Sequence, residues 1–170
     1  MIKPLVSIIV NCYNGEKYLQ DAINSIYAQS YQNWEIIFWD NQSTDRSASI
    51  IKNYNDSRLR YFYAPTHTLL YDARNWAIDK SRGEFIAFLD SDDYWDNDFL
   101  KLMRHALEQS AASLVYCGWQ NIGVEGGRGD VTCLDARTGD TIWHVQLGNQ
   151  LKGGVPGWGY SESPLVEGDL

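Results

Sequence analysis

Carboxylates that directly follow an apolar run are the side chains of this chain best placed to bind a charged ligand. The segment FLDSDDYWD, residues 88–96, brings Asp90, Asp92 and Asp93 together in this way. Like charges packed so closely repel one another unless a cation or a proton relieves them. Mg²⁺ or Mn²⁺, held by one or two carboxylates and by diphosphate oxygens, is a natural solution. The segment predicts a divalent-metal site, with a solvated acidic turn before a helix as the alternative interpretation.

Polar residues also follow two earlier apolar runs. Asn11, Tyr13 and Asn14 come after SIIV, and Asp40 ends the run EIIFW. Ligands of open α/β sheets lie at the carboxyl ends of strands, so these residues are placed to meet one. A carboxylate fixed there can accept a hydrogen bond from an imide N–H such as that of uracil and so exclude cytosine. The alternatives are an ordinary strand end and a helix cap, a role that Asp45 suits better.

Arg74 and Asn75 begin a helical pattern, DARNWAIDK, shortly before the acidic segment. A guanidinium in this position offers a forked donor to phosphate or uracil oxygens. Taken alone, a surface arginine is the simpler interpretation. The chain contains neither GxGxxG nor GxxxxGK[ST], which argues against a dinucleotide fingerprint and against a phosphate loop of the NTPase type.

A parallel sheet is needed to bring these residues together, and the hydrophobic pattern predicts one. Strand-like runs alternate with helical patterns up to about residue 118, which is typical of βαβ units in an α/β fold with a Rossmann-like, mostly parallel sheet. We expect Ser43 or Thr44 to cap the second helix. The expected strands are 5–10, 34–39, 59–63, 84–89 and 113–117, and the expected helical faces lie within 18–27, 50–54, 71–80 and 98–109.

The composition changes in the last quarter of the chain. Residues 124–170 contain ten glycines, against four in residues 1–123. Two short strand patterns surround a turn at 136–140 and predict a β-hairpin. We place a domain boundary in the flexible segment 123–129, and we expect the tail to be less stable and not to complete the sheet of the first domain.

The bulk composition excludes several classes of protein. A hydrophobic fraction of 44% with 21% charged residues argues for a packed domain, and a net charge of −8 argues against a nucleic-acid partner. Cys12, Cys117 and Cys133 match no zinc or redox spacing and are expected to be free thiols. The first apolar run is too short for a signal peptide or a membrane span. We therefore expect a cytoplasmic protein, membrane-peripheral only through a segment outside this chain.

Four segments in fixed order and spacing carry a family resemblance: VSIIVNCYNGEKYL, EIIFWDNQSTD, ARNWAI and GEFIAFLDSDD. Together they resemble the nucleotide-sugar-binding half of family 2 inverting glycosyltransferases, over about residues 4–122. The resemblance implies an enzyme that binds a nucleotide-diphosphate sugar, by expectation a UDP-sugar. The acceptor would be a glycan, a lipid or a protein, and the sequence identifies neither the acceptor nor the sugar.

The resemblance also implies roles for single residues. The residue matching Tyr13 stacks near uracil, the one matching Asp40 bonds the base, and the one matching Arg74 supports the nucleotide. Asp90 and Asp92 match the aspartates of a DxD motif, which bind the ribose and a Mn²⁺ or Mg²⁺ ion. Asp92 is the expected metal ligand.

The chain departs from the family pattern in two places. Asn41 and Gln42 stand where many members carry Asp-Gly, which leaves the base-contacting aspartate in place. Inverting transfer also needs a general base for the acceptor hydroxyl, and the resemblance stops near Ile122. We assign no catalytic base and expect little transfer by this chain. Three downstream carboxylates lie in no segment that resembles an acceptor region: Glu125, Asp130 and Asp135.

The tail is similar to a different family. The segment GDVTCLDARTGDTIWHVQL resembles a blade fragment of β-propellers of the pyrroloquinoline-quinone dehydrogenase type, in which Trp143 would dock between blades. One blade cannot close a ring, so quinone binding is not expected. The alternative function is a binding module from such a propeller. The resemblances together suggest two domains, 1–123 and 124–170, joined by a gene fusion, a truncated reading frame or an assembly error.

Overall fold

A computed structural model describes residues 4–109, 113–115, 117, 130–134, 141–146 and 165–167 of the protein. Strands and helices alternate up to β5, as the hydrophobic pattern predicts. In chain order the elements are β1 Val6–Cys12, α1 Leu19–Tyr27, β2 Trp34–Asp40, α2 Ser47–Lys52, β3 Leu59–Tyr63, α3 Leu70–Ile78, β4 Phe85–Phe88, α4 Phe99–Gln109, β5 Leu114–Val115, β6 Asp130–Leu134, β7 Thr141–Gln146 and β8 Leu165–Glu167.

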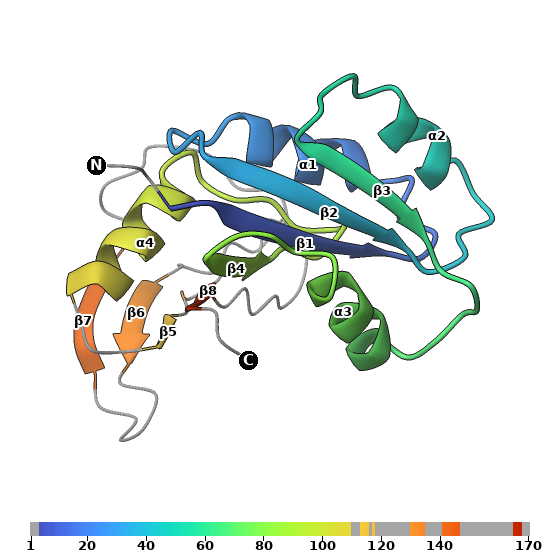
Figure 1. Ribbon diagram of the computed structural model, residues 1–170. Coiled ribbons are helices and arrows are strands. Elements are labelled where there is room, and N and C mark those ends of the chain that lie inside the picture. The colour runs from blue at the N-terminus through green and yellow to red at the C-terminus, as the bar shows by residue number, and fades with distance from the viewer. Residues whose placement is uncertain are drawn as a thin grey trace.

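Six strands form one sheet in the order β3-β2-β1-β4-β8-β5 (Figure 1). β1 pairs in parallel with both β2 and β4, and β2 pairs in parallel with β3. The four parallel strands come from consecutive strand and helix units, because a parallel pair needs a crossover connection. The predicted α/β class with a mostly parallel sheet is confirmed.

Helices cover both faces of the parallel strands. On one face, residues of α1, α2 and α4 share a core with the strands, and this core includes Ile8, Ile23 and Leu100. On the opposite face, Ala73 and Ala77 of α3 pack against the same two strands (Figure 1). Every residue of β1 and β2 is buried, which explains why their sequences are apolar runs rather than alternating patterns.

One expectation about the tail is wrong. We expected residues 124–170 not to complete the sheet, yet β8 lies between β4 and β5 and is antiparallel to both. Backbone N–H and C=O groups make this pairing, so it depends little on the side-chain pattern that sequence reasoning uses. The expected hairpin is confirmed by the antiparallel pairing of β6 with β7. The turn at 136–140, the joint at 123–129 and the side chain of Trp143 lie outside the described residues.

The start of α2 also differs from the prediction. Neither Ser43 nor Thr44 caps this helix, which begins at Ser47. The N-cap residue is Arg46, whose side chain makes no capping bond, and Asp45 accepts a hydrogen bond of 2.9 Å from the Ser47 N–H. The Ser43 hydroxyl and the Thr44 N–H bond to Asn14, on the neighbouring loop.

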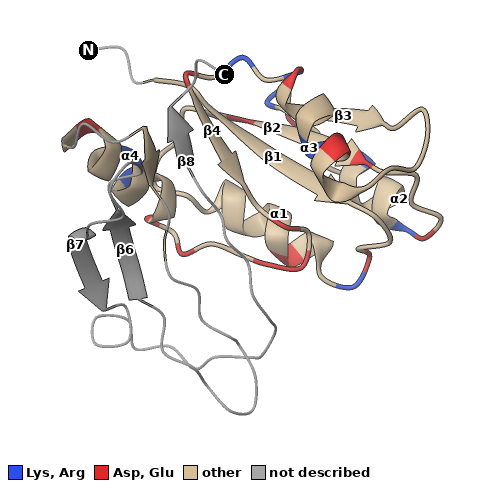
Figure 2. Cartoon of the chain, turned by 90° about the horizontal axis from the view of Figure 1, so that it is seen from below, with Lys and Arg blue, Asp and Glu red and all other residues tan. Residues whose placement is uncertain are grey.

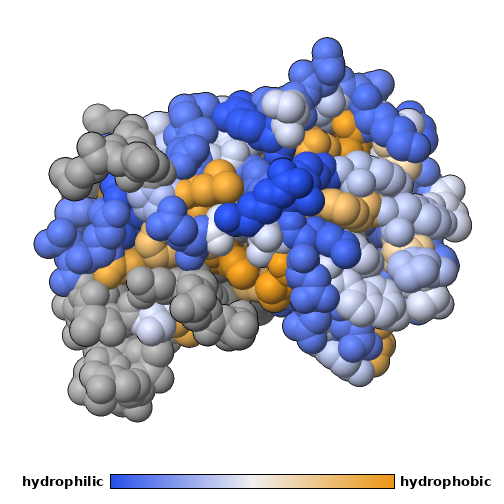
Figure 3. All heavy atoms as spheres, viewed as in Figure 1, coloured by the Kyte–Doolittle hydropathy of each residue, from blue (hydrophilic) through white to orange (hydrophobic). Residues whose placement is uncertain are grey.

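Large apolar side chains remain exposed near the carboxyl end of the parallel strands. The face shown in Figure 3 is largely hydrophilic, with smaller apolar areas. Tyr13 and Tyr63 are more than half exposed, at 54% and 56%, where β1 and β3 end. Leu69, Leu70 and Tyr71, at the start of α3, are exposed as well. This end of the sheet is the part of the surface where a ligand would find both apolar and polar contacts.

The opposite end of the sheet is held by a buried carboxylate. Glu35 is 6% exposed, and its Oε1 accepts hydrogen bonds from the Ser7 hydroxyl and the Arg82 N–H, both at 2.8 Å. Its Oε2 accepts from Arg60 at 3.0 Å. A Cβ on Gly83 would lie 2.6 Å from the Ser7 backbone nitrogen, so only glycine fits there. The network connects β1, β2, β3 and the turn before β4.

We predict that Glu35→Ala lowers the free energy of unfolding by about 2–4 kcal/mol, because it removes the buried acceptor that a hydroxyl, an N–H and a guanidinium share. Urea unfolding followed by tryptophan fluorescence measures this change. Glu84→Ala, at an exposed position, is the control and should stay within about 0.5 kcal/mol of the wild type. Equal stability of the two variants would contradict the assigned role of Glu35.

Two loop residues adopt a backbone conformation that favours glycine. Asn14 has φ 54° and Gln42 has φ 69°, and each lies in the loop that follows a central strand. Asparagine tolerates this region, whereas glutamine pays a larger steric cost. Gln42 stands where many family members carry glycine, and the observed φ gives the physical reason for that preference.

We predict that Gln42→Gly raises the free energy of unfolding by up to about 1 kcal/mol, since relief of the left-handed strain exceeds the added chain entropy. The matched control is Asn53→Gly, at the end of α2, where φ is −78° and glycine should destabilise the protein. Thermal and urea unfolding of both variants test the prediction. A destabilised Gln42→Gly would show that the 3.3 Å bond from Gln42 to the Ala64 carbonyl matters more than strain.

Candidate functional site

Two loops meet at the carboxyl end of β1 and β2 and are held together by hydrogen bonds. The Asn14 N–H donates to the Ser43 hydroxyl at 3.1 Å, and the Thr44 N–H donates to the Asn14 side chain at 2.8 Å. The Glu16 N–H donates to Asp45 at 2.9 Å. Bonds formed in both directions fix the two loops relative to each other. The two loops therefore form a rigid surface against which a ligand can bind.

Asn11, predicted from the sequence to meet a ligand, lies at the end of β1 with an unsatisfied donor. Its side chain is buried, at 8% exposure, and its Nδ2 has no hydrogen-bond partner in the described part of the chain. Its register partner on β2 is Trp39, whose Nε1 is buried and unpartnered among the same residues. Buried donors are nearly always paired in folded proteins, so these two neighbouring donors are candidates for hydrogen bonds to a ligand.

An aromatic pair joins the loops that follow β1 and β3. The rings of Tyr13 and His67 are 4.4 Å apart between centroids, at an angle of 55°. His67 is held by a 2.8 Å contact from its Nδ1 to the Asn41 carbonyl oxygen. The Asn41 side chain in turn donates to the Thr68 carbonyl at 2.8 Å. Tyr13 was predicted as a site residue, whereas His67 was missed because it lies in an irregular loop with no motif around it.

Asp40 reaches the same end of the sheet, but its carboxylate points into the protein. The residue is fully buried, with Oδ1 accepting from the Ser43 N–H and Oδ2 from the Tyr61 hydroxyl, both at 2.7 Å. Burial first, and then the bond to Asp40, raise the pKa of Tyr61 well above its usual value. The tyrosine therefore stays a hydrogen-bond donor to Asp40. Contact of Asp40 with a base remains a prediction.

Arg74 and Asp90, predicted separately, form an ion pair. The Arg74 Nη2 lies 2.7 Å from the Asp90 Oδ1, and each side chain is about a third exposed. The guanidinium also lies 5.3 Å from the ring centroid of Phe88. The pair joins α3 to the loop after β4, so Arg74 fixes the first carboxylate of the DxD segment.

The other two acidic residues of this loop face different surroundings. Asp92 is exposed and has no hydrogen-bond partner in the described residues. Burial, and to a smaller extent the charge of Asp93, raise the pKa of the Cys117 thiol to about 11, which places Asp93 near Cys117. Cys12 and Cys117 are free, as expected. The three carboxylates thus do not converge on one point.

No group of three His, Cys, Asp or Glu side chains is arranged to hold a metal in the described part of the chain. A magnesium or manganese site for a nucleotide needs fewer protein ligands, because diphosphate oxygens and water complete the coordination. Asp92, which is unpaired and exposed, fits this role, with Asp90 beside it on the same turn. Asp93 as a further ligand stays a prediction.

Several other expectations fall outside these residues. Glu125 and Asp135 lie outside the described segments, and only the backbone of Asp130, in β6, is described. We assign no general base. Among the described residues, no helix is long and apolar enough to span a membrane.

Comparison with known proteins places this geometry in a family. The sequence profile of "Glycosyl transferase family 2" matches residues 7–154. An uncharacterized glycosyltransferase of Haemophilus influenzae is 39% identical over 154 residues, 89% of this chain and 61% of that protein. Two further curated relatives are matched over 50% and 47% of their length, so the chain spans about half of such proteins.

Two solved structures share the fold. The crystal structure of S. aureus TarS 1-349 in complex with UDP-GlcNAc has a TM-score of 0.59 at 30% identity, over 64% of this chain and 32% of that one. The mannosyltransferase PcManGT from Pyrobaculum calidifontis, in complex with GDP-Man and Mn²⁺, has a TM-score of 0.64 at 25% identity, over 68% of this chain and 36% of that one.

The family match also bears on the tail. It continues through the joint expected at 123–129 and ends at residue 154, within the segment interpreted as a propeller blade. The propeller resemblance, and a binding module as the alternative function, find no support in these matches. The family model covers most of the chain, and the chain belongs to glycosyl transferase family 2.

Proposed function

We propose that this chain binds a nucleotide-diphosphate sugar, UDP-linked, as the donor of an inverting glycosyl transfer. The observation that carries the proposal is the parallel pairing of β1 with β4, which brings Asn11 and Tyr13 to the same end of the sheet as Asp90, with Arg74 of α3 paired to Asp90. Support comes from TarS, which was solved with UDP-GlcNAc and is 30% identical to this chain.

The base binds against the exposed ring of Tyr13, which His67 supports from the side. The unpartnered amide of Asn11 donates to a carbonyl of the base or to a ribose oxygen. A uracil imide reaches Asp40 only if the residues that cover it move, since the carboxylate is fully buried. We therefore assign Asp40 a positioning role, through its bonds to Ser43 and Tyr61.

The diphosphate binds at the acidic loop through a divalent cation. Asp92 is the proposed ligand of Mn²⁺ or Mg²⁺, with Asp90 as a second ligand or as a contact to the ribose. The metal, when bound, stabilises the charge of the departing diphosphate. Arg74 holds Asp90 in place and offers its remaining N–H groups to the nucleotide. The Mn²⁺ of the related mannosyltransferase structure supports this assignment.

We predict that UDP binds the chain with Mn²⁺ or Mg²⁺ present and loses most of its affinity in excess chelator, because carboxylates repel a diphosphate without a cation. Titration calorimetry with UDP measures the affinity. Asp92→Asn should weaken binding by about tenfold or more. Asp79→Asn, an exposed carboxylate at the end of α3, is the matched control and should bind as the wild type does. Undiminished binding in chelator would refute the metal bridge.

We further predict that Tyr13→Ala lowers the affinity for UDP by about tenfold, whereas Tyr13→Phe keeps it, since the ring face makes the contact. His67→Ala should have a smaller effect in the same direction, because His67 only supports the Tyr13 ring. Calorimetry with UDP and Mn²⁺ compares the three variants. Equal affinity of Tyr13→Ala and the wild type would place the base elsewhere.

A further inference from the structure

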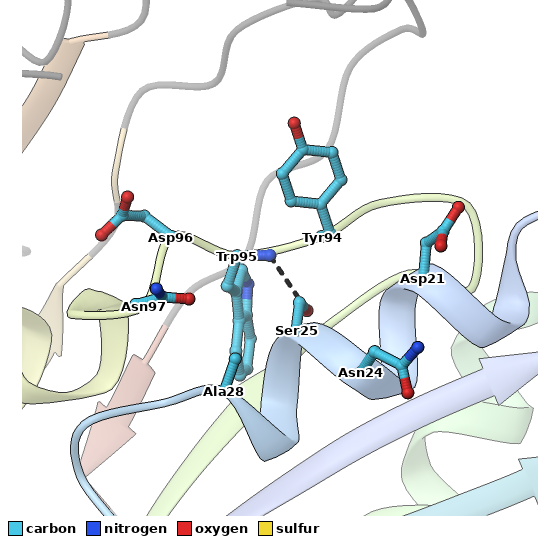
Figure 4. A pocket seen from close by; sticks show the side chains of 8 residues that line it. All are labelled: Asp21, Asn24, Ser25, Ala28, Tyr94, Trp95, Asp96 and Asn97. Atoms are coloured by element: carbon cyan, nitrogen blue, oxygen red, sulfur yellow. Dashed lines mark hydrogen bonds between the residues drawn. The ribbon is translucent and has the colours of Figure 1, made fainter. Parts of the chain in front are cut away.

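The acidic loop between β4 and α4 lies against the segment that runs from the end of β1 into α1. Figure 2 shows the acidic positions of this loop beside α1. Ser91, the middle residue of the DxD segment, contacts Gly15 in the loop that precedes α1. Further along, the Trp95 N–H donates to the Ser25 hydroxyl of α1 at 3.1 Å, as Figure 4 shows. The first of these two contacts lies within the DxD segment itself.

Close packing accounts for the glycine at position 15. A Cβ built on Gly15 would lie 2.8 Å from the Cys12 Sγ, and 3.0 and 3.3 Å from the Ser91 Oγ and Cβ. A carbon atom cannot lie so close to a sulfur atom without displacing it, because protein interiors are close-packed. The φ of Gly15 lies outside the left-handed region, so its backbone conformation does not require glycine. We call this three-residue arrangement the Gly15 contact.

The buried thiol of Cys12 is the centre of a cluster of small polar groups at this contact. Burial raises the pKa of the thiol, so it stays neutral. Hydrogen bonds offset part of the rise, and they come in decreasing order from the Ser47 side chain, the Gly15 backbone, Ser43 and Ser91. The Gly15 N–H also donates to the Ser47 hydroxyl at 3.0 Å. The cluster thus joins the end of β1, the loop after β2, the start of α2 and the acidic loop.

The Gly15 contact connects the two sides of the proposed donor site. On one side, Gly15 follows Asn14 and Tyr13, the residue whose ring is proposed to bind the base. On the other side, Ser91 directly precedes Asp92, the proposed metal ligand. A nucleotide diphosphate extends over both sides, so the distance between them determines whether its base and its metal-bound phosphates fit at the same time.

A small divalent cation makes that distance critical. Mg²⁺ requires oxygen ligands at about 2.0–2.1 Å in nearly ideal octahedral geometry, whereas Ca²⁺ accepts about 2.3–2.6 Å and a flexible arrangement. A side chain on Gly15 would displace its neighbours by a few tenths of an ångström. A displacement of this size lengthens a metal bridge beyond what Mg²⁺ accepts, and it leaves the stacking of a base on an aromatic ring nearly unchanged.

We propose that the Gly15 contact sets the spacing between the base side and the metal side of the donor site, and thereby couples nucleotide binding to the binding of a small divalent cation. The inference rests on the proposed donor function. Cys12, Gly15 and Ser91 are positioning residues in this assignment, because they act through Tyr13 and Asp92.

Titration calorimetry of the 170-residue chain with UDP, in Mg²⁺, in Ca²⁺ and in excess chelator, tests the proposal. Gly15→Ala should reduce the gain in UDP affinity that Mg²⁺ provides by about tenfold, within the usual range of coupling between two ligands. The gain that Ca²⁺ provides should fall less, since Ca²⁺ accepts longer bonds. The affinity that remains in chelator should not change. Adding Cys12→Ala to Gly15→Ala removes the closest atom and should recover part of the lost gain.

Two serine variants complete the experiment. Ser91→Ala should lower the Mg²⁺ gain in the same direction, because it removes a hydrogen bond to the thiol, and it decides the question if Gly15→Ala does not fold. Ser25→Ala is the matched control, since it removes a buried hydroxyl that holds the same loop at Trp95. This control should lower the thermal stability and leave the Mg²⁺ gain unchanged.

The outcomes separate this proposal from the donor function. An unchanged Mg²⁺ gain in Gly15→Ala and Ser91→Ala overturns the role of the contact, while UDP binding by the wild type keeps the donor assignment. An equal loss with Ca²⁺, or an equal loss in Ser25→Ala, also overturns it, since any loosening of the loop would then have the same effect. Absence of Mg²⁺-dependent UDP binding by the wild type overturns the donor assignment, and the role of the contact with it.

Discussion

The parallel pairing of β1 with both β2 and β4 is the constraint on which the site depends. Parallel strands end at the same edge of the sheet, so the loops after β1, β2 and β4 meet there although they are separated in the sequence. Ile9 pairs with Phe88 in this register, which brings the end of β1 level with the acidic loop. Asn11 and Asp90 become neighbours because of backbone pairing, and the side chains then determine what the edge binds.

The two ends of the sheet differ in how buried polar side chains are bonded. At the amino end, Glu35 is saturated by Ser7, Arg60 and the Arg82 N–H, and a network satisfied in this way rigidifies the strands. At the carboxyl end, Asn11 and Trp39 keep buried donors without partners in the described residues. The Glu35 network binds the strands together at the amino end, whereas the donors of Asn11 and Trp39 are available to a ligand at the carboxyl end.

Sequence reasoning predicted the features that repeat locally. The apolar runs predicted the parallel strands. Polar residues at strand ends, such as Asn11 and Asp90, predicted which edge of the sheet holds the candidate site. It missed features set by distant contacts. The burial of Asp40 depends on Tyr61, twenty-one residues later, and the role of His67 depends on Tyr13 and on the Asn41 carbonyl. β8 was missed for the same reason, since it pairs with a strand that lies far from it in the sequence.

Asn41 and Gln42 depart from the Asp-Gly of the family pattern, and the structure gives a physical reason for the residues present. Asparagine at 41 lets one side chain both donate to the Thr68 carbonyl and accept from the Thr68 N–H, at 2.8 and 3.2 Å. An aspartate could accept but not donate, so the loop that carries His67 would be held less firmly. The strained φ of Gln42 is kept in the same turn. Because strain persists only where the surroundings determine it, the bonds from Asn41 and Asn14 hold this turn in the geometry that places His67 beside Tyr13.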